Sequence, residues 1–162
     1  AHHLNEEASR AIESLYRAGM KIRAIHLTGF KDEAAIRQMY SEAGVPAEVH
    51  AFLQDMARAY AAADFAISRS GAASCAEMAA FGLPSLLVPY PLAARDHQTA
   101  NARALEKAGA AEIRAQDMVT AEWLTDYLGK IAQDPDRLKR MRAAALKLAV
   151  LDGAERLAAL VE

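Results

Sequence analysis

The stretch that decides the fold is residues 65–88, FAISRSGAASCAEMAAFGLPSLLV. Its first four residues predict a short apolar strand, and residues 69–74 predict a loop of small residues. Residues 75–81 are expected to form a helix that ends at Gly82, and residues 84–89 a second apolar strand. A strand, a helix and a second buried strand in this order are typical of a parallel β-α-β unit.

The same alternation of helix and strand continues on both sides of this unit. Further helices are expected over residues 4–18, 31–43, 55–62 and 97–108, and further strands over residues 22–28, 48–52 and 110–113. Beyond these the pattern is helical only, with one helix over residues 120–133, a second that Asp134 and Pro135 open, and a further turn near Gly153. The sequence therefore predicts an α/β fold with a Rossmann-like parallel sheet and helices on both faces. No flexible stretch divides the chain, so residues 1–162 are interpreted as one domain.

Composition excludes several classes of protein. The 162 residues are enough for a domain with its own core, and a net charge of −2 with both signs mixed gives no electrostatic basis for binding nucleic acid. No run of residues approaches the roughly 20 apolar positions of a membrane-spanning helix. Because Cys75 is the only cysteine, an internal disulfide is excluded and a reducing compartment is indicated.

The loop after Ser68 is the first candidate site, because ligands of parallel sheets bind outside the carboxyl ends of the strands. Gly71 and the alanines beside it would let backbone N–H groups approach a ligand closely, and the following helix N-terminus favours an anion such as a diphosphate. Glu77 can accept two hydroxyl hydrogens, as from a ribose. An ordinary tight turn, with Glu77 supporting the helix dipole in the first turn, explains the same residues equally well. The loop lacks the G-x-G-x-x-G pattern, so NAD or FAD is not specifically indicated.

The second candidate site is the polar run DHQTAN at residues 96–101, at the start of a predicted helix. Its amide and hydroxyl side chains can form paired hydrogen bonds with sugar hydroxyls. The alternative is a helix simply capped by Asp96. The residues alone leave both interpretations open.

Four stretches together resemble the MurG family of glycosyltransferases, which have the two-domain GT-B architecture. They are AADFAISRSGAASCAEMAAFGLP at residues 62–84, HLTG at 26–29, VHAFLQDM at 49–56, and DHQTANA at 96–102 followed by LEKAGAA at 105–111. Leu27 stands where that family has Gln. The resemblance covers nearly the whole chain, and implies that it is the C-terminal, donor-binding half of a GT-B glycosyltransferase.

The resemblance also implies a role for each site residue. The backbone of Leu53 would bind the uracil edge, with Phe52 and Met56 shaping the base pocket. The diphosphate would be lined by backbone groups of Ser70, Gly71, Ala72, Ala73 and Ser74. Glu77 would bind the ribose hydroxyls, and Arg69 would have a structural role. The N-acetylglucosamine would be held by Asp96, Gln98 and Thr99, with Asn101 supporting their helix.

The function implied is that of a hexosyltransferase of peptidoglycan biosynthesis, and hence of cell-wall growth, cell shape and cell division. UDP-N-acetylglucosamine would be the donor for inverting transfer to lipid I, giving lipid II, with no cofactor and no metal. An N-terminal domain that binds the lipid-linked muramyl-pentapeptide, and a glycine-rich loop, are expected to precede Ala1 in the complete protein. These 162 residues are thus expected to contain no catalytic residue and to be inactive alone. The expected location is cytoplasmic, peripheral on the inner face of the bacterial plasma membrane.

Two alternatives remain. One is a stand-alone nucleotide-sugar-binding module that works with a separate partner chain. The other is a UDP-sugar epimerase of the same architecture, which would need an acid/base pair across the sugar.

Other polar and aromatic residues are given structural interpretations. His2 and His3 are expected to form a disordered end, and His26 and His50 to be structural histidines. Cys75 is expected to be buried and inert. The stripe of Trp123, Tyr127 and Ile131 is expected to pack in the core. The basic residues between 137 and 147 are expected to form a solvated face, with weak contact to anionic lipid as the alternative.

Overall fold

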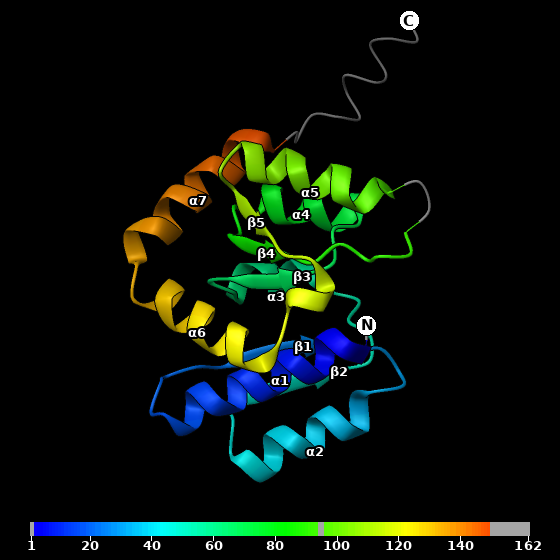
Figure 1. The fold of residues 1–162 in the computed structure, drawn as a ribbon, viewed down its shortest axis with the longest axis vertical. Helices are drawn as coiled ribbons and strands as arrows, with labels where there is room; N and C mark the ends of the chain where they lie inside the picture. The colour runs from blue at the N-terminus through cyan, green and yellow to red at the C-terminus, as the bar shows by residue number, and fades with distance from the viewer. Residues whose placement is uncertain (1, 94–95, 150–162) are drawn as a thin grey trace, which may run out of the picture. The chain divides into compact units, whose positions relative to one another are not determined.

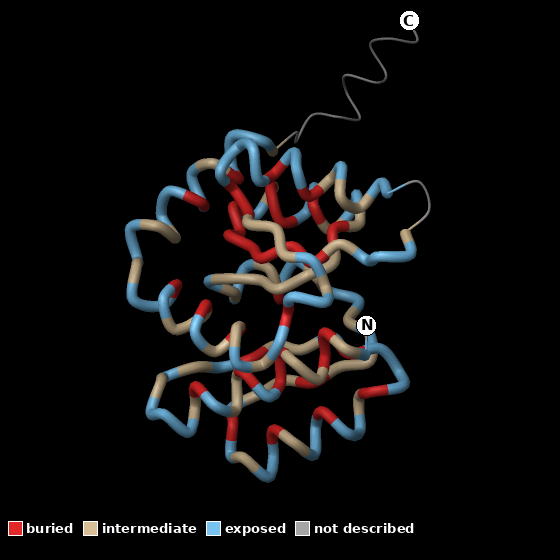
Figure 2. Tube along the Cα trace, in the orientation of Figure 1, coloured by how far each residue is buried: buried red, intermediate tan, exposed pale blue. Residues whose placement is uncertain are grey.

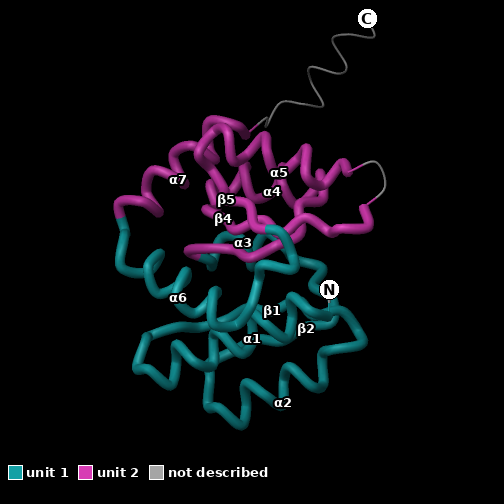
Figure 3. The backbone as a smooth tube through the Cα atoms, in the orientation of Figure 1, with its two compact units in different colours: residues 1–63, 115–135 teal, residues 64–114, 136–162 magenta. Residues whose placement is uncertain are grey.

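The computed structural model describes residues 2–93 and 96–149, and the turn expected near Gly153 lies outside them (Figure 1). The chain separates into two compact units (Figure 3). Unit 1 comprises Ala1–Ala63 and Ala115–Pro135, and unit 2 comprises Asp64–Arg114 and Asp136–Glu162. The interpretation of the whole chain as one domain stays a prediction.

Unit 1 contains a pair of parallel strands, β1 (Ala24–Leu27) and β2 (Ala47–His50). Its helices are α1 (His2–Arg17), α2 (Glu33–Ala43), α3 (Met56–Ala62) and α6 (Ala121–Ala132), with a short 3-10 helix, η2 (Gln116–Met118). The core gathers Ala24, Ile36, Tyr40, Val45 and Val49, with Ile12 and Tyr16 of α1 packed against it.

The helices of unit 1 follow from local sequence. In α1 the buried apolar residues Leu4, Ala8, Ala11 and Leu15 recur at helical spacing and form one face. In α6 the hydroxyl of Thr120 accepts a hydrogen bond from the Trp123 N–H group. Of the predicted stripe, Tyr127 and Ile131 are buried in the core, whereas Trp123 is half-buried.

Unit 2 contains a three-stranded parallel sheet in the order β3-β4-β5, formed by β3 (Ala66–Ser68), β4 (Ser85–Leu87) and β5 (Ala111–Ile113). Its helices are α4 (Ala72–Ala80), α5 (His97–Lys107) and α7 (Pro135–Leu148), whose first residue closes unit 1. The central strand β4 is buried along its whole length (Figure 2), as expected for a parallel strand covered on both faces.

The parallel α/β fold is confirmed, but the strands are shorter than expected and hydrogen-bond into two sheets, one in each unit. Helix α4 begins at Ala72, three residues before the expected start at 75, because Gly71 already takes the extended backbone of an N-cap residue. Pro135 opens α7 as expected. Among the described residues, none of the helices is long and apolar enough to cross a membrane.

Candidate functional site

Of the candidate uracil-pocket residues, Phe52 and Leu53 lie in the segment of unit 1 that links β2 to α3, and Met56 is the first residue of α3. The Phe52 side chain is 69% exposed, whereas Leu53 and Met56 are half-buried. Asp55 accepts a hydrogen bond from the Arg58 N–H group at 3.1 Å, which fixes the start of α3 and confirms the predicted cap. Phe52 therefore offers an exposed aromatic ring, which can stack on a planar ring.

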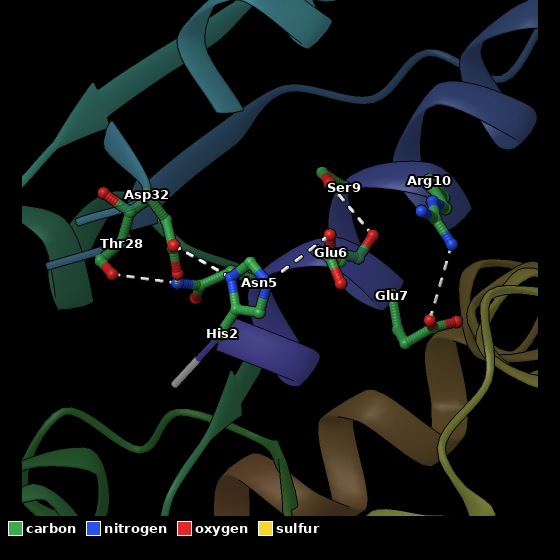
Figure 4. Close-up of polar contacts among 8 residues, drawn as sticks. All are labelled: His2, Asn5, Glu6, Glu7, Ser9, Arg10, Thr28 and Asp32. Atoms are coloured by element: carbon green, nitrogen blue, oxygen red, sulfur yellow. Dashed lines mark hydrogen bonds and ion pairs between the residues drawn. The ribbon is translucent and has the colours of Figure 1, made fainter. Parts of the chain in front are cut away.

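Hydrogen bonds from the buried Asn5 and the exposed His2 join the start of α1 to the loop after β1 (Figure 4). The Nδ2 atom of Asn5 donates to the Thr28 carbonyl at 2.8 Å and to the Asp32 carboxylate at 2.7 Å. His2 Nδ1 lies 2.9 Å from the other Asp32 oxygen. The Asn5 amide and the His2 imidazole, through these hydrogen bonds, hold the pKa of the Asp32 carboxyl below its ordinary value.

The expectation of a disordered end at His2 and His3 is wrong. Both residues lie in the first turn of α1, where His3 Nε2 donates to the Gln116 carbonyl at 3.2 Å and to the Val119 carbonyl at 3.0 Å. The acceptors come from residues more than a hundred positions away in the chain, so no local pattern in the sequence could have revealed them.

His26 extends this network into the core of unit 1. Its Nε2 atom lies 3.3 Å from the Asn5 Oδ1 atom, which can only accept, so Nε2 carries the proton. Nδ1 then accepts from the Tyr40 hydroxyl at 3.0 Å. Burial lowers the pKa of His26 to about 4, although the Asp32 charge acts in the opposite direction. The ring is therefore neutral at pH 7, and the structural interpretation of His26 is confirmed.

The small-residue loop of unit 2 leads directly into α4. Ser70 is fully buried, Gly71 is the N-cap with φ −61° and ψ 147°, and Ala72 and Ala73 are exposed. The first bond of the helix runs from the Cys75 N–H group to the Gly71 carbonyl at 2.9 Å. The N–H groups that precede it belong to the helix end, the arrangement that binds phosphate.

Gly71 is not required by contacts within the chain. Its φ is negative, and a Cβ atom added there would come no closer than 3.9 Å to the Ser74 hydroxyl. A side chain would therefore fit this position in the chain as it stands, and the space that it would fill lies at the helix N-terminus.

Glu77 is exposed on α4, but it does not lie in the first turn, where a carboxylate would stabilise the helix dipole. Because α4 begins at Ala72, Glu77 lies in the second turn rather than the first. The effect of the helix dipole on a side chain falls off within the first turn. The alternative that Glu77 merely supports the helix start is therefore weakened.

Cys75 is the buried, inert residue that was expected. It is only 4% exposed, and burial raises the pKa of its thiol. A raised pKa keeps the sulfur protonated and unreactive near neutral pH.

The polar residues at the start of α5 make contacts within the chain. Asp96 has a left-handed backbone with φ 53°, and its carboxylate accepts from the Thr99 hydroxyl at 2.5 Å. Asp96 is the N-cap residue of α5, as the capping interpretation expects, but no backbone N–H group of α5 donates to its side chain. Gln98 Oε1 accepts from the Tyr90 N–H group at 2.9 Å.

Asn101 and Arg69 link the loops of unit 2. The Nδ2 atom of Asn101 donates to the Ser70 carbonyl at 3.0 Å and so joins α5 to the loop before α4. Arg69 Nη1 donates to the carbonyls of Val88 and Pro89 at 3.0 and 3.3 Å. Burial lowers the pKa of the Arg69 guanidinium, and the expected structural role of this residue is supported.

A metal centre is not formed by the described residues: no three His, Cys, Asp or Glu side chains among them lie close enough together to hold an ion. The contacts of Asn5, Asp32 and Tyr90 were not anticipated. Only Asn5 carried a signal, because a polar residue there interrupts the apolar face of the first helix.

The parallel α/β fold, with a small-residue loop entering a helix at a strand end, defines the C-terminal half of a GT-B glycosyltransferase. Residues 1–157 match the profile of the Glycosyltransferase family 28 C-terminal domain, and the chain belongs to this family.

Curated relatives carry the name UDP-N-acetylglucosamine–N-acetylmuramyl-(pentapeptide) pyrophosphoryl-undecaprenol N-acetylglucosamine transferase. The protein from Hahella chejuensis is 47% identical over 146 residues, which are 90% of this chain and 40% of that protein. The protein from Sorangium cellulosum is 43% identical over 96% of this chain and 39% of its own length. The chain therefore spans about two fifths of these relatives.

Solved structures agree with this assignment. The crystal structure of Acinetobacter baumannii MurG matches 99% of this chain and 46% of its own, with a TM-score of 0.87 and 32% identity. A kitacinnamycin glycosyltransferase matches with a TM-score of 0.61 at 21% identity, which shows the fold alone.

Proposed function

We propose that this chain binds UDP-N-acetylglucosamine as a sugar donor. The observation that carries the proposal is the loop before α4, where a buried Ser70 and an N-cap Gly71 precede two exposed alanines at a helix N-terminus. The helix end attracts negative charge, and small residues let phosphate oxygens reach its N–H groups. The room for a side chain at Gly71 supports the same idea, because the glycine would serve the ligand rather than the fold.

The remaining donor contacts follow the family pattern. Phe52, Leu53 and Met56 would bind the uracil, with the Leu53 backbone reading its edge. Glu77, which is exposed in the second turn of α4, would accept hydrogen bonds from both ribose hydroxyls. The N-acetylglucosamine would be held by Asp96, Gln98 and Thr99.

In the complete protein, we propose inverting transfer of N-acetylglucosamine to lipid I, which gives lipid II. An acceptor hydroxyl oxygen bonds to the anomeric carbon while the bond from that carbon to the UDP oxygen breaks, and a base takes the hydroxyl proton. The residues of this chain would orient the donor and stabilise the charge that develops on the departing UDP. The base and the lipid-linked acceptor would be held by the other half of the protein.

The names of the relatives support a lipid partner, because undecaprenol is a membrane lipid component of the acceptor that they specify. We therefore propose that the complete protein works at the inner face of the bacterial plasma membrane, as a peripheral enzyme of cell-wall growth, cell shape and division.

Calorimetry with UDP, ADP and GDP tests the donor proposal. The chain should bind UDP more tightly than either purine nucleotide, since the Leu53 backbone would bind the uracil edge. Equal affinity for all three would contradict it. A transfer assay with radiolabelled UDP-N-acetylglucosamine should detect product only when the acceptor-binding half is joined to the chain.

A further inference from the structure

We propose that Arg69 is a positioning residue that couples the diphosphate loop to the sugar-contact end of α5, without itself contacting the donor. This inference rests on the proposed function. All the residues that carry it belong to unit 2.

Arg69 holds the chain segment that follows β4. Its Nη1 atom donates to two successive carbonyls, of Val88 at 3.0 Å and Pro89 at 3.3 Å. Its guanidinium carbon lies 5.5 Å from the centre of the Tyr90 ring. Two carbonyl contacts and a ring contact from one planar group fix the path of residues 88–90.

The fixed segment in turn orients Gln98. The N–H group of Tyr90 donates to Gln98 Oε1 at 2.9 Å. An amide whose oxygen is engaged in this way presents its NH₂ group on the other side. Arg69 therefore acts on the proposed sugar contact through Tyr90.

A second contact joins α5 to the loop before α4. Asn101, one turn after Gln98 on α5, donates to the Ser70 carbonyl at 3.0 Å, and Ser70 is the next residue after Arg69. The loop that would bind the diphosphate and the helix that would bind the sugar are thus joined at two points. Displacement of either one strains the other.

A direct contact between this part of the guanidinium and the diphosphate would undo the arrangement. Nη1 would have to leave both carbonyls, and Val88 is fully buried, so its carbonyl would lose a donor in a place that solvent does not reach easily. The geometry therefore favours Arg69 as a positioning residue rather than as a residue that binds the diphosphate.

The test compares UDP and UDP-N-acetylglucosamine as calorimetric probes of Arg69→Met. The ratio of the two affinities should fall by about tenfold toward UDP, the equivalent of losing one oriented hydrogen bond, while the affinity for UDP itself changes little. Arg69→Lys should be intermediate, because an ammonium keeps the charge but cannot reproduce the planar contacts. Arg103→Met, at an exposed arginine of α5, is the matched control and should leave both affinities unchanged.

Amide hydrogen exchange without ligand gives a second readout. The Tyr90 N–H group should exchange faster in Arg69→Met than in the unmodified chain or in Arg103→Met. Tyr90→Ala removes the ring beneath the guanidinium at a position that is 41% exposed, and should shift the affinity ratio in the same direction even if Arg69→Met does not fold.

The outcomes are distinct. Equal loss of both ligands in Arg69→Met, with unchanged Tyr90 exchange, would show that the guanidinium binds the diphosphate and would overturn the coupling. An unchanged ratio in a variant that still binds both ligands would also overturn it, and would leave the proposed function standing. If the unmodified chain binds neither ligand, the proposed function fails and the coupling to the sugar fails with it.

Discussion

The Nδ2 atom of Asn5 lies 2.7 Å from the Oδ2 atom of Asp32, and this hydrogen bond joins the first helix to the loop that follows the first strand. Asn5 is only 5% exposed, and all its described polar contacts lie inside unit 1. Its amide donates to Thr28 and Asp32 and accepts from His26, so that one side chain satisfies three other polar groups. A buried residue with this many partners should matter more to stability than its size suggests.

Asn5→Ala should therefore destabilise the chain strongly. Removal of the amide takes the Asn5 donor away from the Thr28 carbonyl and from the Asp32 Oδ2 atom, and the expected cost is roughly 2–4 kcal/mol in the free energy of unfolding. Urea unfolding, followed by circular dichroism, measures this value. Arg10→Ala on the exposed side of α1 is the control and should change the free energy by less than about 0.5 kcal/mol. Equal small losses in both variants would contradict the role of Asn5.

Stability should also fall in mild acid because of His26. Its pKa is lowered from 6.5 to about 4 in the folded chain. Between these values the unfolded state binds a proton that the folded state does not, so the free energy of unfolding decreases as pH falls from 6.5 toward 4. Above pH 6.5 both states are neutral at His26 and this contribution vanishes. A shift of this size corresponds to about 3 kcal/mol across the window.

Unfolding measured at several pH values checks this prediction, with His26→Gln as the comparison. Glutamine keeps a donor and an acceptor near Tyr40 and Asn5 but does not titrate, so the decline between pH 6.5 and 4 should flatten. Asp32 acts at lower pH, because its pKa lies below the ordinary 3.8 and its stabilising contribution is lost only as pH falls through the lowered value. An unchanged decline in His26→Gln would assign the acid sensitivity to other groups.

The end of α4 offers a test of packing. Gly82 has a φ of +59°, and a Cβ atom added there would lie 2.7 Å from Leu146 Cγ and 2.9 Å from Leu146 Cδ2. Gly82→Ala should cost roughly 2–4 kcal/mol, from the left-handed backbone and the clash with α7 together. Gly109→Ala has a similar φ of +79° but only a 3.9 Å contact with Ala144, so it should cost about 1–2 kcal/mol. Thermal unfolding of both variants isolates the clash, and equal costs would show that Leu146 moves aside freely.

The fold class could be predicted because its signals are local. Alternating apolar strands and helices, Gly82 after the fourth helix and Thr120 before the sixth each act over a few residues, and the structure confirms them. The helix start at Ala72 was missed because alanines are small and show no apolar–polar periodicity, so the sequence does not distinguish a loop from the first turn of a helix. That small difference moved Glu77 from the first turn to the second and changed the interpretation of its charge.

The polar contacts could not be predicted in the same way. Asp96 is the expected N-cap residue of α5, yet its backbone is left-handed and its carboxylate accepts from the Thr99 hydroxyl rather than from a backbone N–H group. His3 was expected to lie in a disordered N-terminal end, yet it donates to the carbonyls of Gln116 and Val119. Such hydrogen bonds depend on which distant segments lie next to each other in the folded chain. A single sequence does not show these tertiary contacts directly.

Glu77 gives the sharpest test of the proposed donor site. Its carboxylate is exposed and lies beyond the first turn of α4, so neither burial nor the helix dipole gives it a large structural role. Glu77→Ala should weaken UDP binding by roughly 1.5–3 kcal/mol, the range for hydrogen bonds to a charged group, while the free energy of unfolding changes by less than about 0.5 kcal/mol. Calorimetry with UDP and with its 2′,3′-dideoxy analogue checks the cause: the substitution should weaken binding of UDP and not of the analogue, because only UDP has the ribose hydroxyls.

Ala76→Ser, at the exposed neighbouring position, is the control and should bind both ligands as the unmodified chain does. If Glu77→Ala weakened both ligands equally, the carboxylate would be acting on the phosphate loop, and a large loss of stability would make it structural instead.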